Sequence, residues 1–130
     1  MKKHTNISAL FYLSALYDGI LGIAFLVAAP AIFTWSGVTP PNHWGYVQFP
    51  GALLIVFALM FLAVARQPVT NRGLIVYGML LKVSYCGIVF YYWAVSGLPD
   101  IWKPWAIADL VFLALFVWAY QTLARGKVRN

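Results

Sequence analysis

Four stretches of the chain, each about twenty residues long, contain almost no charged side chains. They cover residues 7–33, 46–65, 73–95 and 105–123. A helix needs ~20 mainly apolar residues to cross the ~30 Å hydrocarbon core of a bilayer, so each stretch is long enough. The stretches lack the alternation typical of strands, and a lone four-stranded sheet would leave its edges unpaired in lipid. The sequence therefore predicts an all-α membrane protein, a bundle of four transmembrane helices.

The composition argues against a soluble globular domain. Of the 130 residues, 63% are hydrophobic and 9% are charged, and Glu is absent. Soluble domains carry about 25% charged residues, which they need to cover a surface in water. The length is sufficient for one domain, so we expect a single membrane domain over residues 1–130.

The first stretch has some features of a cleavable signal peptide. It follows Met1-Lys2-Lys3, and small residues at 29–31 fit a loose cleavage site. Its apolar run is longer than the core of a signal peptide, and Asp18 interrupts its centre. We therefore expect this stretch to be kept as the first span, over residues 7–33.

Basic residues are distributed unevenly between the two sides of the predicted bundle. Four crossings place both termini and residues 66–72 on one side, with residues 34–45 and 96–104 on the other. Because cytoplasmic segments are enriched in Lys and Arg, we expect both termini to face the cytoplasm. The opposite side has Lys103 alone, whereas the cytoplasmic side has seven basic residues: Lys2, Lys3, Arg66, Arg72, Arg125, Lys127 and Arg129.

The sequence lacks the motifs of nucleic-acid binding, metal binding and common enzyme chemistry. The net charge is +6, but most of the basic residues lie at the chain ends and in one short loop. They do not form the continuous basic stripe that is typical of nucleic-acid binding. His4 and His43 fall on opposite sides of the membrane, and Cys86 is the single cysteine. We therefore expect no catalytic residue, metal or resident cofactor, and a quinone or a lipid is left open as an occupant.

Three ionisable residues lie inside the predicted spans, where a charge costs ~3 kcal/mol or more. At 1.5 Å per residue, Asp18 and Lys82 are both ~13 Å from the cytoplasmic boundary, and Asp109 is ~8 Å further out than Lys82. Since intramembrane charges usually pair, we predict an Asp18–Lys82 pair, with Asp109 as an alternative partner. Such a pair either orients the helices or forms a proton-coupling or ligand-binding site, and the sequence leaves both interpretations open.

Small and hydroxyl-bearing residues accompany these charges. Ser14 and Gly22 lie four residues either side of Asp18, and small residues at this spacing are typical of close helix packing. Tyr85 lies one turn from Lys82, where its hydroxyl could donate a hydrogen bond to an Asp. With Tyr17, these residues complete the candidate site, which comprises Ser14, Tyr17, Asp18, Lys82, Tyr85 and Asp109.

Aromatic residues gather at the predicted spans and their ends. Four Trp residues, at positions 35, 44, 102 and 105, are expected to form an aromatic belt at the outer boundary. We expect the Tyr residues to anchor the helices at the membrane interfaces and to pack between them. The alternative is that some of them line a pocket for a flat hydrophobic ligand.

Several segments resemble the DoxX-like and BphX-like small four-helix membrane proteins of bacteria. They are residues 17–22 (Tyr-Asp-Gly-Ile-Leu-Gly) with a following Pro30, residues 48–52 (Gln-Phe-Pro-Gly-Ala), residues 66–68 (Arg-Gln-Pro) and residues 82–86 (Lys-Val-Ser-Tyr-Cys). The resemblance implies a four-helix fold in the bacterial inner membrane. Some members of the group are associated with membrane oxidoreductases.

Three functional hypotheses remain. The first is a non-enzymatic accessory or interaction subunit of a membrane assembly, either a larger complex or a homo-oligomer surrounded by lipid. The second is a binder of a hydrophobic ligand such as a quinone or an aromatic compound. The third is a small proton-coupled transporter that uses Asp18. The strong charge asymmetry disfavours the dual-topology variants of the small multidrug transporters, which need a weak bias.

Overall fold

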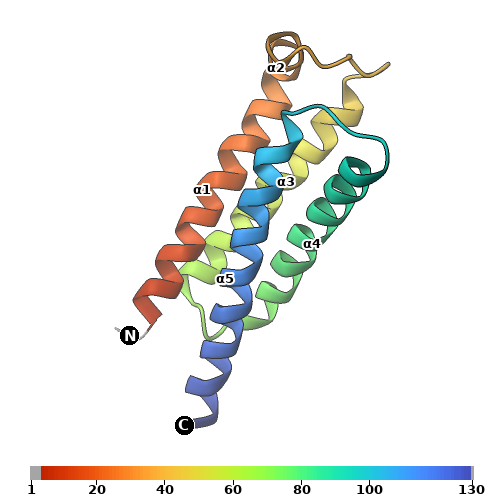
Figure 1. Cartoon of the computed structure of the whole chain (residues 1–130). Helices are drawn as coiled ribbons and strands as arrows, with labels where there is room; N and C mark the ends of the chain where they lie inside the picture. Colours follow the sequence, from red (N-terminus) through yellow and green to blue (C-terminus); the bar gives the residue numbers. More distant parts are fainter. Residues whose placement is uncertain (1–3, 130) are drawn as a thin grey trace.

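The computed structural model describes residues 4–129, with side chains described as far as residue 124. The helices in this part of the chain are α1 (Thr5–Val27), α2 (Ala29–Ser36), α3 (Gly45–Arg66), α4 (Arg72–Val95) and α5 (Trp102–Arg129) (Figure 1). Helices α1, α3, α4 and α5 are each long and apolar enough to cross a membrane. The prediction of four such helices is therefore confirmed, with boundaries that differ from the expected ones by a few residues.

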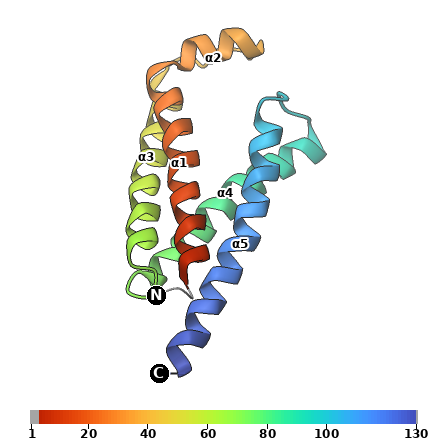
Figure 2. The same cartoon turned by 90° about the vertical axis from the view of Figure 1, so that its left-hand side faces the viewer.

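The first predicted span is wrong at its outer end. The apolar run over residues 7–33 is not one helix, because α1 ends at Val27 and the short helix α2 turns away from its axis (Figure 2). Pro30 explains the break, since proline has no N–H for a helical hydrogen bond to the Leu26 carbonyl, and its ring crowds that carbonyl. The side-chain nitrogen of Gln48 on α3 donates to the Leu26 oxygen instead, at 3.4 Å.

The four long helices form two antiparallel pairs, α1 with α3 and α4 with α5. The pairs lie close together at the end that carries the chain termini and diverge toward α2 (Figure 2). Phe11, Phe61 and Phe116 join them near the termini, with ring centroids 4.8 to 5.9 Å apart. All three rings are fully buried, so the apolar core occupies the half of the bundle near the termini.

The turn between α3 and α4 lies at the same end as both termini (Figure 1). Asn71 donates from its side chain to the Ala63 carbonyl at 2.8 Å, a second hydrogen bond to an oxygen that already accepts from the Gln67 backbone N–H at the end of α3. The Arg72 guanidinium stacks on the Tyr120 ring at 3.5 Å and its Nε donates to the Tyr120 carbonyl. Arg72 thereby fixes the start of α4 against α5.

Helices α1 and α3 approach each other most closely where two glycines meet. A Cβ atom on Gly22 would lie 2.6 Å from the Gly51 carbonyl oxygen, and one on Gly51 would lie 3.0 Å from the Gly22 oxygen. No side chain fits between the backbones at these distances. The expected packing role of the small residues on the Asp18 face is confirmed at this contact.

The outward faces of the long helices are apolar. Leu16, Leu59, Ile88 and Val111 are each more than half exposed, and they come from α1, α3, α4 and α5 in turn. A contiguous apolar exterior on every long helix is unfavourable in water and matches the acyl chains of a bilayer.

Candidate functional site

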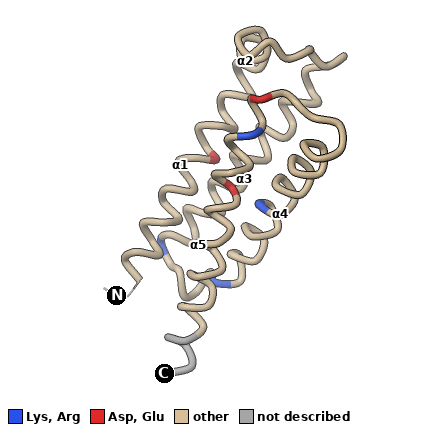
Figure 3. Tube along the Cα trace, in the orientation of Figure 1, with Lys and Arg blue, Asp and Glu red and all other residues tan. Residues whose placement is uncertain are grey.

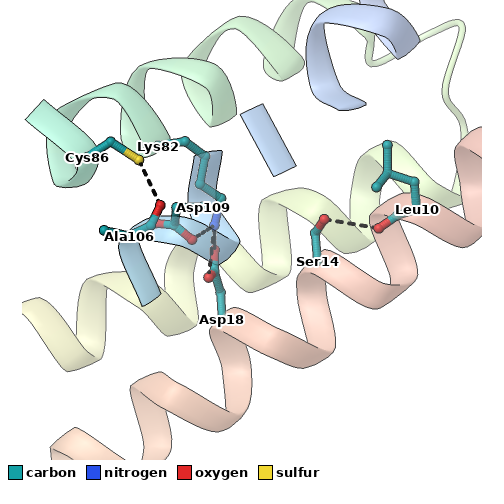
Figure 4. A network of polar contacts seen from close by, with 7 residues as sticks. All are labelled: Leu10, Ser14, Asp18, Lys82, Cys86, Ala106 and Asp109. Carbon is teal, nitrogen blue, oxygen red and sulfur yellow. Dashed lines mark hydrogen bonds and ion pairs between the residues drawn. The ribbon is translucent and has the colours of Figure 1, made fainter. Parts of the chain in front are cut away.

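Lys82 contacts both Asp18 and Asp109 at once (Figure 4). Its Nζ lies 3.2 Å from Asp18 Oδ1, 3.3 Å from Asp18 Oδ2 and 3.1 Å from Asp109 Oδ1. The predicted Asp18–Lys82 pair is present, but Asp109 is a second simultaneous partner and not an alternative one. The triad of Asp18, Lys82 and Asp109 therefore connects α1, α4 and α5.

The triad is enclosed by the bundle, and Figure 3 shows that acidic and basic positions occur partway along the helices as well as at the helix ends. Asp18 and Lys82 are each 1% exposed, and Asp109 is 7% exposed. The rings of Tyr17, Phe61 and Phe112 surround Lys82 Nζ, with centroids 5.2 to 5.7 Å away. An ammonium at this distance from aromatic faces gains cation–π attraction, which adds to its attraction to the carboxylates.

Helical spacing explains why these side chains point inward. Ser14, Asp18 and Gly22 repeat every four residues on α1 and are all buried. Gly78, Lys82 and Cys86 repeat at the same interval on α4 and are buried too. Each charge therefore lies in the middle of a face of small residues, as the sequence predicts.

Ser14 does not contact the triad. Its hydroxyl donates to the Leu10 carbonyl of its own helix at 3.0 Å, as Figure 4 shows. The small Ser14 side chain lets the helices pack closely, and its single donor is already used within its own helix.

The proposed hydrogen bond from Tyr85 to an aspartate is wrong. The Tyr85 hydroxyl donates to the Trp102 carbonyl at 2.8 Å, because the first turn of α5 leaves that oxygen within reach of α4. Cys86 makes a similar contact from its thiol to the Ala106 carbonyl, at 3.4 Å between sulfur and oxygen (Figure 4). Both side chains therefore connect α4 to the first turns of α5 by hydrogen bonds.

An apolar cavity of about 450 Å³ lies between the two helix pairs, and its lining extends from Asp18 and Asp109 to Phe33 of α2. Asp18 and Asp109 form part of its lining, so the two aspartates of the triad are the polar floor of the cavity. Its apolar walls come from all four long helices and include Leu21, Phe25, Leu54, Phe57, Leu81 and Trp102. The cavity forms because the two helix pairs diverge toward α2.

Two hydrogen-bond donors at the cavity are unpaired in the described part of the chain. The Tyr17 hydroxyl and the Trp105 indole nitrogen are both buried, and neither makes a hydrogen bond of good geometry, although the Tyr17 hydroxyl lies beside the Asp109 carboxylate. Both residues line the cavity, and their ring centroids are 6.1 Å apart. Buried donors without partners are costly, and an acceptor atom inside the cavity would remove that cost.

Sequence reasoning missed the α3 side of the site. Leu54 and Phe57 line the cavity, yet an apolar residue that faces a cavity looks the same in a sequence as one that faces lipid. Trp105 was assigned to an interfacial aromatic belt, whereas its indole nitrogen is buried at the cavity. The six predicted site residues do not all converge, because Ser14 and Tyr85 are bonded elsewhere.

No family model, no curated protein and no solved structure matches the chain at a significant level. Function must therefore be argued from the cavity and the triad themselves.

Proposed function

We propose that the protein binds a small hydrophobic molecule, such as a quinone or an aromatic compound, in the cavity between its helix pairs. The observation that carries this proposal is an apolar cavity with unpaired polar groups at its floor. A volume of about 450 Å³ falls within the ~300–1,000 Å³ range of small-molecule sites. The apolar walls would hold the body of the ligand, and Tyr17 and Trp105 would donate to its oxygen atoms.

Addition of a ligand should raise the unfolding temperature of the purified protein in detergent. Suitable probes are a quinone with a short isoprenoid tail and benzophenone, because each combines a flat unsaturated ring with a carbonyl oxygen. A ligand that binds only the folded state at 100 times its dissociation constant adds ~2.7 kcal/mol of stability. A differential scanning measurement with increasing probe concentration reads out this effect.

A variant that fills the cavity provides the matched comparison. Leu53→Trp places an indole at the edge of the cavity, whereas Leu59→Trp adds the same group to the lipid-facing surface of the same helix. The first variant should lose the ligand-induced shift and the second should keep it. An equal loss or an equal shift in both variants would contradict a site at this cavity, and an accessory subunit without a ligand would show no shift in any of the three proteins.

We propose further that the protein is located in a bacterial inner membrane, with both termini in the cytoplasm. Seven basic residues on the side of the termini against one on the other side support this orientation. Lys2 and Lys3 lie outside the described residues, and so do the side chains of Arg125, Lys127 and Arg129.

Reporter fusions in a bacterial host test the orientation. Green fluorescent protein at the C-terminus should fluoresce, because it folds in the cytoplasm, and alkaline phosphatase at the same position should be inactive. Alkaline phosphatase inserted after Pro40, between α2 and α3, should be active. The reverse pattern of activities would show that the chain is inserted the other way round.

A further inference from the structure

The three charged groups of the triad do not balance one another. Lys82 supplies one positive charge, whereas Asp18 and Asp109 supply one negative charge each when both are ionised. All three side chains are buried, and an uncompensated charge in an apolar interior is strongly unfavourable. Neutrality therefore requires one more positive charge, and a proton on one carboxylate is the smallest cation that supplies it.

The geometry distinguishes the two carboxylates. Lys82 Nζ contacts both oxygens of Asp18 but only Oδ1 of Asp109 (Figure 4). Because Lys82 contacts both oxygens of Asp18 and one oxygen of Asp109, Asp18 is the better ionised partner of Lys82, and Asp109 keeps a second oxygen for the proton. Asp109 is also the more accessible of the two to a proton from water, since its side chain is 10% exposed against 2% for Asp18. This assignment differs from the sequence-based hypothesis, in which Asp18 is the residue that titrates.

The described surroundings supply no further cation. Helix α3 contributes the apolar rings of Phe57 and Phe61 at this level. The ionisable groups that face Asp109 from the other helices are Tyr17 and Asp18 on α1, and Lys82, Tyr85 and Cys86 on α4. Of these groups only Lys82 is positively charged, so none of them supplies the positive charge that the triad lacks.

We infer that Asp109 carries one exchangeable proton, and that its protonated carboxyl group donates a hydrogen bond to an oxygen atom of the ligand. The inference rests on the proposed ligand cavity, since Asp109 lines it. It restricts the expected class of ligand to hydrophobic molecules that carry a carbonyl or ether oxygen. The proton comes from water and returns to water when Asp109 ionises, and no bond of the ligand breaks.

The consequence is a link between ligand binding and pH. A protonated carboxyl group donates a hydrogen bond, whereas a carboxylate only accepts, so an ionised Asp109 would repel the ligand oxygen. The protonated form should bind the ligand more tightly. Affinity should therefore be highest at low pH and should fall as the pH rises through the ionisation of Asp109, by at most about tenfold per pH unit for one proton.

Two probes that differ by one oxygen atom test the ligand class. Benzophenone has a carbonyl group, and diphenylmethane has a methylene group in its place. Wild-type protein in nanodiscs should bind benzophenone about tenfold more tightly than diphenylmethane at low pH, because one buried hydrogen bond is gained. Only the affinity for benzophenone should decrease as the pH rises.

Two variants distinguish the effect of the Asp109 proton from the effect of the side chain itself. Asp109→Asn keeps a neutral donor of the same shape, so it should bind benzophenone about as tightly as wild type does at low pH, without a dependence on pH. Asp109→Leu lacks this donor but keeps Tyr17 and Trp105, so it should prefer benzophenone less strongly than wild type does at low pH, and its affinity for either probe should not change with pH. The inference is overturned if the wild-type affinity for benzophenone does not change with pH, or if Asp109→Asn retains the pH dependence of wild type.

A measurement without ligand keeps the protonation testable by itself. Infrared spectra of the ligand-free protein should contain the C=O stretch of a protonated carboxyl group, which Asp109→Asn removes and Asp100→Asn in the exposed loop leaves in place. If neither probe binds, the proposal of a ligand-binding cavity is wrong. The infrared band then shows by itself whether Asp109 is protonated. If the probes bind but the band is absent, the cavity stands and the proton inference fails.

Discussion

Replacement of Lys82 by Met should destabilise the bundle by about 3–5 kcal/mol, the largest effect that we expect from a single substitution. Methionine keeps much of the apolar length of the lysine side chain but removes the ammonium that contacts Asp18 and Asp109. Two buried carboxyl groups would then face each other without a cation. The free energy of unfolding in mixed detergent micelles measures the loss.

Removal of all three charges should restore most of that stability. In the triple variant Lys82→Met/Asp18→Asn/Asp109→Asn no ionised group is buried, and such replacements of buried ion pairs are often neutral or stabilising. Lys103→Met is the matched control, because Lys103 pairs with the exposed Asp100 and a surface pair contributes about 1 kcal/mol or less. If Lys82→Met unfolds at the same denaturant concentration as wild type, the triad does not hold α1, α4 and α5 together.

Substitution of Ala for Gly22 should also destabilise the protein, by about 1–3 kcal/mol. The new methyl group would lie 2.6 Å from the Gly51 carbonyl oxygen and 2.9 Å from a side-chain carbon of Ile55. The backbone oxygen cannot rotate away as a flexible side chain can, so α1 and α3 must separate. Because both helices line the cavity, this variant should bind the cavity ligand more weakly as well as unfold more easily.

Gly87→Ala is the control for this substitution. A Cβ atom on Gly87, which lies on the exposed face of α4, would have no atom within 4 Å. Alanine is favoured over glycine within a helix by roughly 0.5–1 kcal/mol, so this variant should be as stable as wild type or slightly more stable. Equal destabilisation by Gly22→Ala and Gly87→Ala would mean that the contact with Gly51 is not the cause.

The helices could be predicted from the sequence because span length and hydropathy are local properties. The break after Val27 was not predicted, since the apolar run continues through it, and only the effect of Pro30 on the Leu26 carbonyl separates α2 from α1. The inward direction of Asp18 and Lys82 was predictable from the four-residue spacing of their small neighbours. Helical periodicity fixes which residues share a face, without reference to the rest of the fold.

The arrangement of the site depends on how the helices tilt, which the sequence does not specify. Residue counts from the helix ends placed Asp109 ~8 Å from the level of Lys82, by 1.5 Å of rise per residue. A lysine side chain reaches along its helix and covers this difference, and the Asp109 carboxylate lies 3.1 Å from Lys82 Nζ. The residue counts thus brought Asp109 within reach of Lys82, but they did not predict that Lys82 contacts both aspartates at once, which depends on how the helix pairs are inclined. The cavity walls at Leu54 and Phe57 were not predicted, because an apolar residue that faces a cavity looks the same in a sequence as one that faces lipid.

Photolabelling tests the ligand site most directly, because benzophenone is itself photoreactive. Irradiation of the protein with benzophenone in nanodiscs, followed by peptide mapping, locates the bound molecule. The cavity predicts that labels concentrate on its lining, at Leu21, Leu54, Phe57 and Leu81, and that excess unlabelled quinone removes them. Labels distributed over the outward-facing residues Leu16, Leu59, Ile88 and Val111, and insensitive to quinone, would contradict a binding site between the helix pairs.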